Sequence, residues 1–111
     1  LAEKNFAGPE FSEPFNIGPE KEDNRPVIDV ANTLLKYLPD HPGVDATGMK
    51  NQVHEANLLM LDCSKAKKRL GWKPKLNLDS ALRLTGEWYK AQFDKKDLRE
   101  ITLRQIRDYL A

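Results

Sequence analysis

The stretches that resemble β-strands are few, short and far apart in this chain. Residues 15–18 form a brief apolar run that ends in a Gly-Pro turn, and residues 56–61 form a second run. A short edge strand around Val44 is a third candidate. Two or three strands of this length do not make a stable sheet alone. We therefore expect an α/β chain that is mostly helical, whose short strands join a sheet supplied by other sequence.

Apolar residues at helical spacing predict two central helices. The first begins at Pro26 and ends at Pro39, and the second covers residues 80–93 after a cap at Asp79. Gly86 lies inside the second helix, where glycine costs about 1 kcal/mol relative to alanine. A close neighbouring backbone would explain that glycine. The inward stripe of this helix is expected to consist of Leu82, Thr85, Trp88, Tyr89 and Phe93.

The two ends of the chain also carry helix signals. Residues 1–4 resemble the last turn of a helix, so we expect the chain to be a piece of a longer protein. Thr102 and Gln105 match a capping box and predict that the last helix opens there. The inward residues of that helix are expected to be Leu103, Ile106 and Leu110.

Charge and composition exclude several classes of protein. The 111 residues weigh 12.7 kDa and carry 18 basic and 17 acidic residues. A net charge of +1 creates no field that would attract nucleic acid or an anionic membrane. The longest apolar run has four residues, too few to span a bilayer, and a single cysteine fits a reducing compartment. We expect one domain in a cytoplasmic protein, with no nucleic-acid or membrane partner.

The motifs of several familiar chemistries are absent from the sequence. None of the six glycines has the spacing of a dinucleotide-binding loop, a P-loop or a nucleophile elbow. His41, His54 and Cys63 are too few and too far apart for structural zinc. Cys63 is expected to be a small buried residue beside a helix cap rather than a nucleophile. The sequence therefore predicts neither a metal site nor a catalytic residue.

Two polar patterns each have two interpretations. His54-Glu55 pairs an imidazole with a carboxylate, which suits acid–base chemistry or a polar ligand. The spacing alone favours an ordinary loop pair, with the glutamate bound to a nearby lysine or arginine. Residues 65–75 contain six cations, which suit a phosphate or nucleic-acid contact, but also a solvated helix face. Trp72, Trp88 and Tyr89 are expected to pack rather than to stack on bases.

One continuous motif resembles a known family. Residues 62–66 read Asp-Cys-Ser-Lys-Ala after an apolar run, a short helix then ends in Leu70-Gly71-Trp72, and Pro74 follows. The helix over 65–70 takes its cap from Asp62 or Ser64, and Gly71 suits its end because glycine adopts the left-handed conformation at low cost. Together with Asn-Ile-Gly at 16–18, this pattern resembles the C-terminal part of extended short-chain dehydrogenase/reductases that act on nucleotide sugars.

Within that family, the chain most resembles the CDP-glucose 4,6-dehydratases. His54-Glu55-Ala56 precedes the motif, and Glu55 lies seven residues before Asp62, which is the spacing of the acidic residue in relatives. Gln52 stands where relatives often carry arginine. The resemblance implies that Gln52 and His54 meet the nucleotide or diphosphate of the substrate, and that Glu55 contacts substrate or holds the loop. Asp62, Ser64 and Lys65 are expected to be structural.

The resemblance also implies what the whole enzyme does. It would bind NAD in an N-terminal Rossmann domain and convert CDP-glucose to CDP-4-keto-6-deoxyglucose, acting as a homo-oligomer. This chain lacks the glycine-rich loop and the Tyr-x-x-x-Lys pair, so residues 1–111 are expected to be the substrate-binding lobe, inactive alone and without NAD. The alternatives are a lobe of another nucleotide-sugar epimerase or dehydratase, or a free-standing interaction domain whose basic helix docks an acidic partner.

Overall fold

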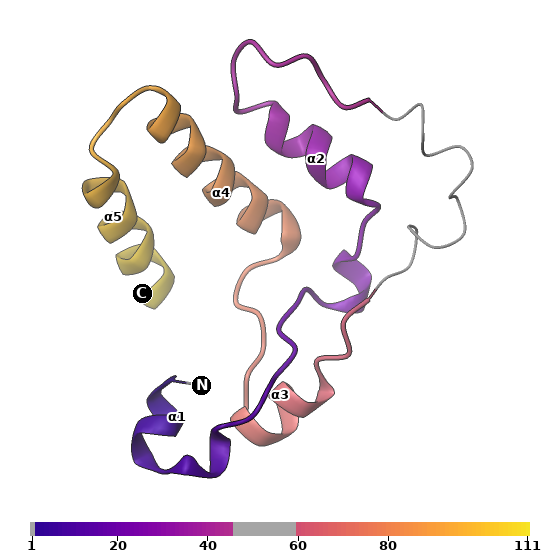
Figure 1. Cartoon of the computed structure of the whole chain (residues 1–111), viewed down its shortest axis with the longest axis vertical. Helices are drawn as coiled ribbons and strands as arrows, with labels where there is room; N and C mark the ends of the chain where they lie inside the picture. Colours follow the sequence, from indigo (N-terminus) through magenta and orange to yellow (C-terminus); the bar gives the residue numbers. More distant parts are fainter. Residues whose placement is uncertain (1, 46–59) are drawn as a thin grey trace.

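The computed structural model describes residues 2–45 and 60–111 and shows a helical chain over those ranges. Within them no residue lies in a β-strand. Figure 1 shows α2, α4 and α5 gathered at one end of the molecule and α1 and α3 at the other. The elements are α1 (Ala2–Ala7), η1 (Pro9–Phe11), η2 (Lys21–Asp23), α2 (Val27–Leu35), α3 (Ser64–Leu70), α4 (Leu78–Phe93) and α5 (Leu98–Leu110), where η marks a 3₁₀ turn.

The best-packed part of the fold is the layer in which α4 lies between α2 and α5. Gly86 is buried in α4, and a Cβ atom at this position would collide with the ring of Tyr37, which follows α2. The expected close neighbour of Gly86 is therefore an aromatic side chain rather than a backbone. On the other side of α4, the indole nitrogen of Trp88 donates to the hydroxyl of Thr102 in α5 at 3.0 Å.

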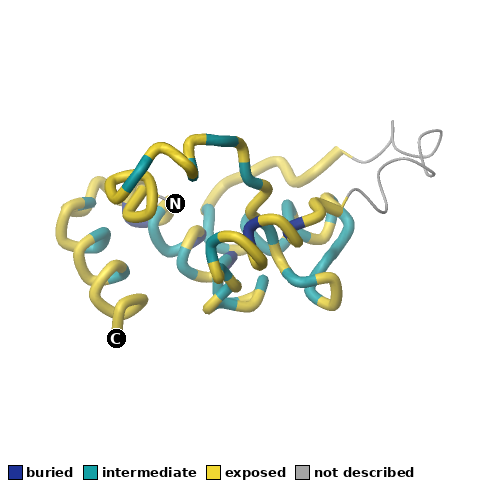
Figure 2. The backbone as a smooth tube through the Cα atoms, turned by 90° about the horizontal axis from the view of Figure 1, so that it is seen from below, coloured by how far each residue is buried: buried dark blue, intermediate teal, exposed yellow. Residues whose placement is uncertain are grey.

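The buried core is small for a chain of this length. Only Cys63, Ala66, Leu82 and Ala91 are buried apolar residues in the described part, and Figure 2 shows the tube mostly exposed or half-buried. The chain measures 48 × 41 × 21 Å and exposes 9034 Å². A compact monomer of this mass exposes about 6,200 Å². The chain therefore presents much of its apolar surface without covering it.

The strand expected at residues 15–18 is not formed within the described part of the chain. These residues form neither helix nor strand, and they lie beside residues 61–63, at the end of the second strand candidate. The side-chain amide of Asn16 donates to the carbonyl of Asp62 at 3.4 Å, and Gly18 lies against Leu61 and Cys63. Contact through side chains does not build the backbone ladder that defines a sheet. Residue 44 is likewise not in a strand, and residues 56–59 lie outside the described residues.

Several helix boundaries differ from the sequence prediction, and two of them differ because another residue provides the cap. The helix after Pro26 already ends at Leu35, and residues 36–37 form a turn. Asn77 caps α4 by accepting from the amide of Ser80 at 2.9 Å, so the predicted cap at Asp79 lies inside the helix. Helix α3 begins at Ser64 rather than at residue 65, and the start of α5 also differs. Gly71, with φ 64°, ends α3 as predicted.

The capping box predicted at Thr102 is also wrong. Asp97 caps α5 instead, because its carboxylate accepts from the amides of Arg99 at 2.9 Å and Glu100 at 3.3 Å. The hydroxyl of Thr102 lies one turn inside the helix and donates to the carbonyl of Leu98 at 2.7 Å. The helix therefore starts five residues earlier than expected, and a different face packs on α4.

The predicted inward stripes of α4 and α5 are partly wrong. In α4 the buried residues are Leu82, Gly86 and Ala91, whereas Thr85, Tyr89 and Phe93 are exposed. In α5 the residues expected to face inward, Leu103, Ile106 and Leu110, are all exposed.

Candidate functional site

The family motif lines an open groove between the loop before α2 and the start of α3. The cavity measures about 470 Å³. Its walls mix apolar, hydrogen-bonding and charged side chains, a composition that can hold a ligand with both a flat apolar part and polar groups. The lining residues are Pro19, Glu20, Lys21, Asn24, Met60, Leu61, Asp62, Cys63, Ser64 and Lys67.

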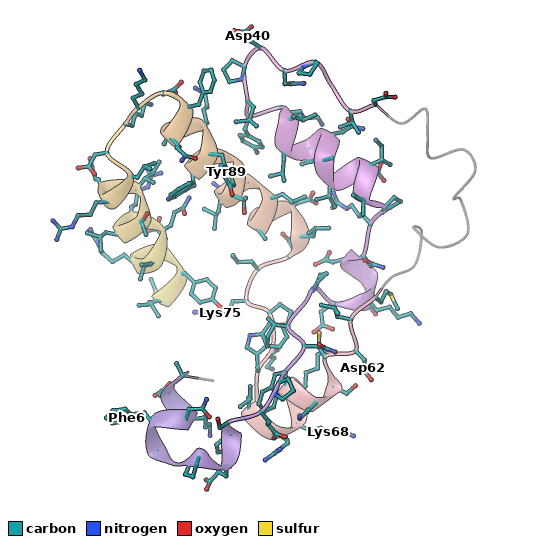
Figure 3. The ribbon with its side chains drawn as sticks, viewed as in Figure 1. Phe6, Asp40, Asp62, Lys68, Lys75 and Tyr89 are labelled. Carbon is teal, nitrogen blue, oxygen red and sulfur yellow. The ribbon has the colours of Figure 1, made fainter. Side chains whose placement is uncertain are left out.

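Asp62 holds the turn that opens α3. Its carboxylate accepts from the amide of Ser64 at 2.9 Å. Hydrogen bonds from the hydroxyl and the amide of Ser64 keep the pKa of Asp62 below its ordinary value, and the positive charges of Lys68 and Lys67 act in the same direction. Figure 3 shows Asp62 and Lys68 on α3 and the segment that leads into it. Asp62 thus accepts from an amide of the first turn, as expected. Ser64 is the first residue of the helix rather than its cap, and Cys63 occupies the cap position without a side-chain hydrogen bond.

Cys63 sits at the floor of the groove and is 7% exposed. Its sulfur lies 3.7 Å from the carbonyl of Leu61 and 4.0 Å from the carbonyl of Gly18. Those contacts join the two segments that carry the family motif. The expectation that this cysteine is a small buried residue beside a helix start is confirmed.

The cations of α3 mostly pair with acidic residues earlier in the chain. Lys65 lies 2.9 Å from the carboxylate of Glu13, and Arg69 pairs with the same carboxylate. Lys67 lies 2.6 Å from the carboxylate of Glu20, and that hydrogen bond raises the pKa of Lys67. Three of the cations in α3 are thus occupied within the chain. These ion pairs count against a helix that docks an acidic partner or a nucleic acid.

Lys65 fulfils the bracing role expected of it. Besides its pair with Glu13, its ammonium donates to the carbonyl of Pro14 at 3.0 Å. It also lies over the ring of Phe15, 4.8 Å from the centroid. One side chain therefore ties α3 to three consecutive residues of the N-terminal loop.

The substrate-contacting residues predicted from the sequence, Gln52, His54 and Glu55, lie outside the described residues. The described chain resumes at Met60, which lines the groove.

Of the residues considered as metal ligands, His41 accepts from the amide of Gly43 at 3.1 Å. Over residues 2–45 and 60–111, no three His, Cys, Asp or Glu side chains form a group that would hold a metal. No helix in these ranges is long and apolar enough to cross a membrane.

Sequence reasoning missed the contribution of the loop at residues 19–24 to this groove. No periodic pattern and no motif marks Glu20, Lys21 or Asn24 in the sequence. Glu20 and Lys67 are 47 positions apart in the sequence, and only the fold brings them together. The turn of η2 is the local feature that places Lys21 and Asn24 on the groove.

Comparison with known proteins supports the resemblance read from the motif. The chain is 36% identical to CDP-glucose 4,6-dehydratase of Salmonella typhimurium over 104 residues, which is 94% of this chain and 29% of that protein. It is 38% identical over 80 residues, 72% of the chain and 12% of the relative, to a trifunctional UDP-glucose 4,6-dehydratase, 3,5-epimerase and reductase of Arabidopsis thaliana.

A third relative is named for a different activity. GDP-mannose 3,5-epimerase of Arabidopsis thaliana is 32% identical over 91 residues, 78% of the chain and 22% of the epimerase. No family model matches the chain. The chain spans less than a third of the length of each of these relatives. It is thus a homologue of one part of the extended short-chain dehydrogenase/reductases that act as nucleotide-sugar dehydratases and epimerases.

Proposed function

We propose that the chain is the nucleotide-sugar-binding lobe of a CDP-glucose 4,6-dehydratase. The observation that carries this proposal is the 36% identity to that enzyme over 94% of the chain. The epimerases and UDP-sugar dehydratases match a smaller share of the chain. A lobe of one of those enzymes is the alternative.

The exposed apolar surface supports a role as part of a larger protein. The chain buries no large side chain completely in the described part. A free-standing domain of about 110 residues normally covers more of its surface. We infer that the remaining lobe of the whole enzyme, a Rossmann domain, covers part of this surface, and that the whole enzyme is cytoplasmic.

The described residues of this chain do not fit an NAD site. A dinucleotide is held where a strand passes through a glycine-rich turn into a helix. In the described part no strand is present, Gly71 ends a helix, and Gly86 lies inside one against Tyr37. We therefore assign NAD, and the redox chemistry that it supplies, to residues outside this chain.

We propose that Gln52, His54 and Glu55 form the loop that contacts the nucleotide sugar. The groove between residues 19–24 and α3 adjoins Met60, where the chain leaves that loop. Lys21 and Asn24 line it and offer donors to phosphate or sugar oxygens. Lys67 also lines it, but its charge is already shared with Glu20.

The test is His54→Ala in the whole enzyme, with His41→Ala as the matched control. Loss of one hydrogen bond to a charged diphosphate should raise KM for CDP-glucose by about tenfold or more, with a smaller change in kcat. His41→Ala should leave both constants unchanged, because His41 bonds its own turn at Gly43. An unchanged KM in the His54 variant would remove this residue from the site.

A second measurement tests the choice of nucleotide. Isothermal titration of the whole enzyme with CDP-glucose, UDP-glucose and GDP-mannose should give the tightest binding for CDP-glucose. Tighter binding of either of the other two sugars would favour the alternative lobe. Binding of none of the three would contradict the proposed function altogether.

A further inference from the structure

Helix α5 carries a second apolar stripe that nothing covers in the described part of the chain. Leu103, Ile106 and Leu110 follow one another at spacings of three and four residues and are 46%, 50% and 72% exposed. The helix contacts α4 through a different face. Thr102 accepts from Trp88, and the side-chain amide of Gln105 donates to the carbonyl of Leu84 at 2.8 Å.

Two opposite charges lie along one edge of this stripe. Glu100 and Arg107 are seven residues apart, so they lie two turns apart on the same side of α5. Among residues 2–45 and 60–111, neither side chain takes part in a hydrogen bond or an ion pair, and only their backbone atoms do. The outward side of α5 therefore combines an apolar seam with one unpaired anion and one unpaired cation.

The order of these residues fits a second copy of the same helix in the antiparallel direction. In such a pair Leu103 lies opposite Ile106 of the other copy, and Arg99 lies opposite Leu110. Glu100 then faces Arg107 of the other copy, and the two-fold axis repeats each contact. In a parallel pair the two-fold axis runs along the seam, so Glu100 and Arg107 of one copy lie on the opposite side of the seam from Glu100 and Arg107 of the other. The two charges then cannot pair between copies, and only the antiparallel arrangement brings them together.

We propose that α5 is a self-association surface through which two copies of this chain pair antiparallel. The seam of Leu103, Ile106 and Leu110 supplies apolar contact, and the Glu100–Arg107 pairs set the direction. A helix of 13 residues is about 20 Å long. The contact is therefore smaller than a standard interface of about 800 Å² per partner, and the association is weak and concentration-dependent.

This proposal does not depend on the proposed function, and the charges allow a sharp test of it. Sedimentation velocity of the 111-residue chain from about 10 μM to 1 mM should show a rising weight-average sedimentation coefficient. Glu100→Arg should weaken the association about tenfold, because two like charges then face each other in both repeats of the contact. Arg107→Glu should do the same with two facing anions.

An equimolar mixture of the two variants should restore the association. In the mixed pair, the introduced arginine of one copy faces the introduced glutamate of the other, and the unchanged Arg107 and Glu100 face each other in the second repeat. Glu3→Arg on α1 and Lys36→Glu after α2 make the same kinds of charge change away from α5 and should leave association unchanged. Ile106→Lys should abolish it. Far-UV circular dichroism confirms that each variant keeps its helices, since all these positions are exposed.

Three results would overturn the proposal. The first is a wild-type chain that stays monomeric up to 1 mM. The second is association that survives both single charge variants. The third is a mixture of the two variants that associates no better than either alone, which would place the contact elsewhere or in another direction.

Discussion

The layer of α2, α4 and α5 and the region around α3 are held together by different forces. In the layer, packing dominates: the ring of Tyr37 lies on Gly86, Leu82 is buried, and Trp88 bonds Thr102 across the helix pair. Around α3, the carboxylate of Glu13 and the cations opposite it make the contacts to the N-terminal loop.

Because of this difference, the stability of the two regions depends on different properties of their side chains. Close packing depends on the size of a side chain and hardly on salt or pH. Ion pairs that are partly exposed depend on charge, are screened by salt, and are individually weak. The family motif lies in the second region, beside the candidate groove. The part of the chain that is proposed to meet a ligand is thus held by the more adjustable forces.

The largest effect on stability should come from adding a single methyl group to the packed layer. Gly86→Ala should lower the free energy of unfolding by about 2 kcal/mol, although alanine is the better helix former by about 1 kcal/mol. A Cβ atom at this position meets the base of the Tyr37 ring, which cannot swing away as the tip of a long side chain can. Urea unfolding of the two proteins measures the difference.

The double variant Tyr37→Ala with Gly86→Ala provides the control. If the clash is the cause, alanine at 86 should stabilise the Tyr37→Ala background by about 1 kcal/mol, because only the helix propensity remains. Stabilisation by Gly86→Ala in the wild-type background would show that the layer is loose, and would remove the contrast with α3.

The sequence predicted the existence of the helices better than their faces. Apolar spacing located α2 and α4, and Gly71 marked the end of α3, because these signals are local. The start of α5 was misplaced, because Asp97 is as good a cap as Thr102 and only the structure shows which one is used. The apolar spacing of Leu103 and Ile106 was recognised, but it does not say whether the stripe faces α4 or points away from it.

The second-largest effect on stability is expected at the ion pairs of α3. Glu13→Gln removes one carboxylate from two cations, Lys65 and Arg69, and should cost about 1 kcal/mol at low salt. The loss should shrink in 0.5 M NaCl, where screening already weakens the pairs. Hydrogen exchange should accelerate in α3 and stay unchanged in α4, which a fold with one cooperative core would not show.

Glu10→Gln is the matched control for this experiment. Glu10 lies in the neighbouring turn η1, and Arg69 contacts its backbone carbonyl at 3.1 Å rather than its carboxylate. Removing that charge should leave both stability and exchange unchanged. Equal effects of the two variants would mean that the general charge of the loop matters, and not the Glu13 contacts.

The candidate groove illustrates a second limit of sequence reasoning. The motif at Asp62–Ser64 was recognisable because it is contiguous. Its opposite wall, with Glu20 and Lys21, comes from a loop without periodic signal. Which residues of that loop meet α3 depends on the path of the chain between them, and no local pattern encodes that path.

The smallest effect should appear at the junction of the two regions, where Arg25 lies 2.8 Å from Asp79 in the first turn of α4. The hydrogen bond from Arg25 lowers the pKa of Asp79. A carboxylate with a lowered pKa stabilises the folded state above its unfolded pKa of about 4, and this contribution is lost as the pH falls through the folded value. Asp79→Asn should therefore be slightly less stable than wild type from pH 7 to pH 5, with the difference vanishing toward pH 2.

Asp94→Asn is the control for the junction, because it removes a similar ion pair that lies within one helix. Lys90 lowers the pKa of Asp94 in the same way, but the pair lies at the end of α4 and joins no second element. Both variants should show the same pH dependence in urea titrations. Only Asp79→Asn should also speed hydrogen exchange in η2, because Arg25 and the bond from the amide of Leu78 to Asp23 hold that turn against α4. Unchanged exchange in η2 would show that Asp23 alone joins the regions, and that the charge of Asp79 contributes nothing to their arrangement.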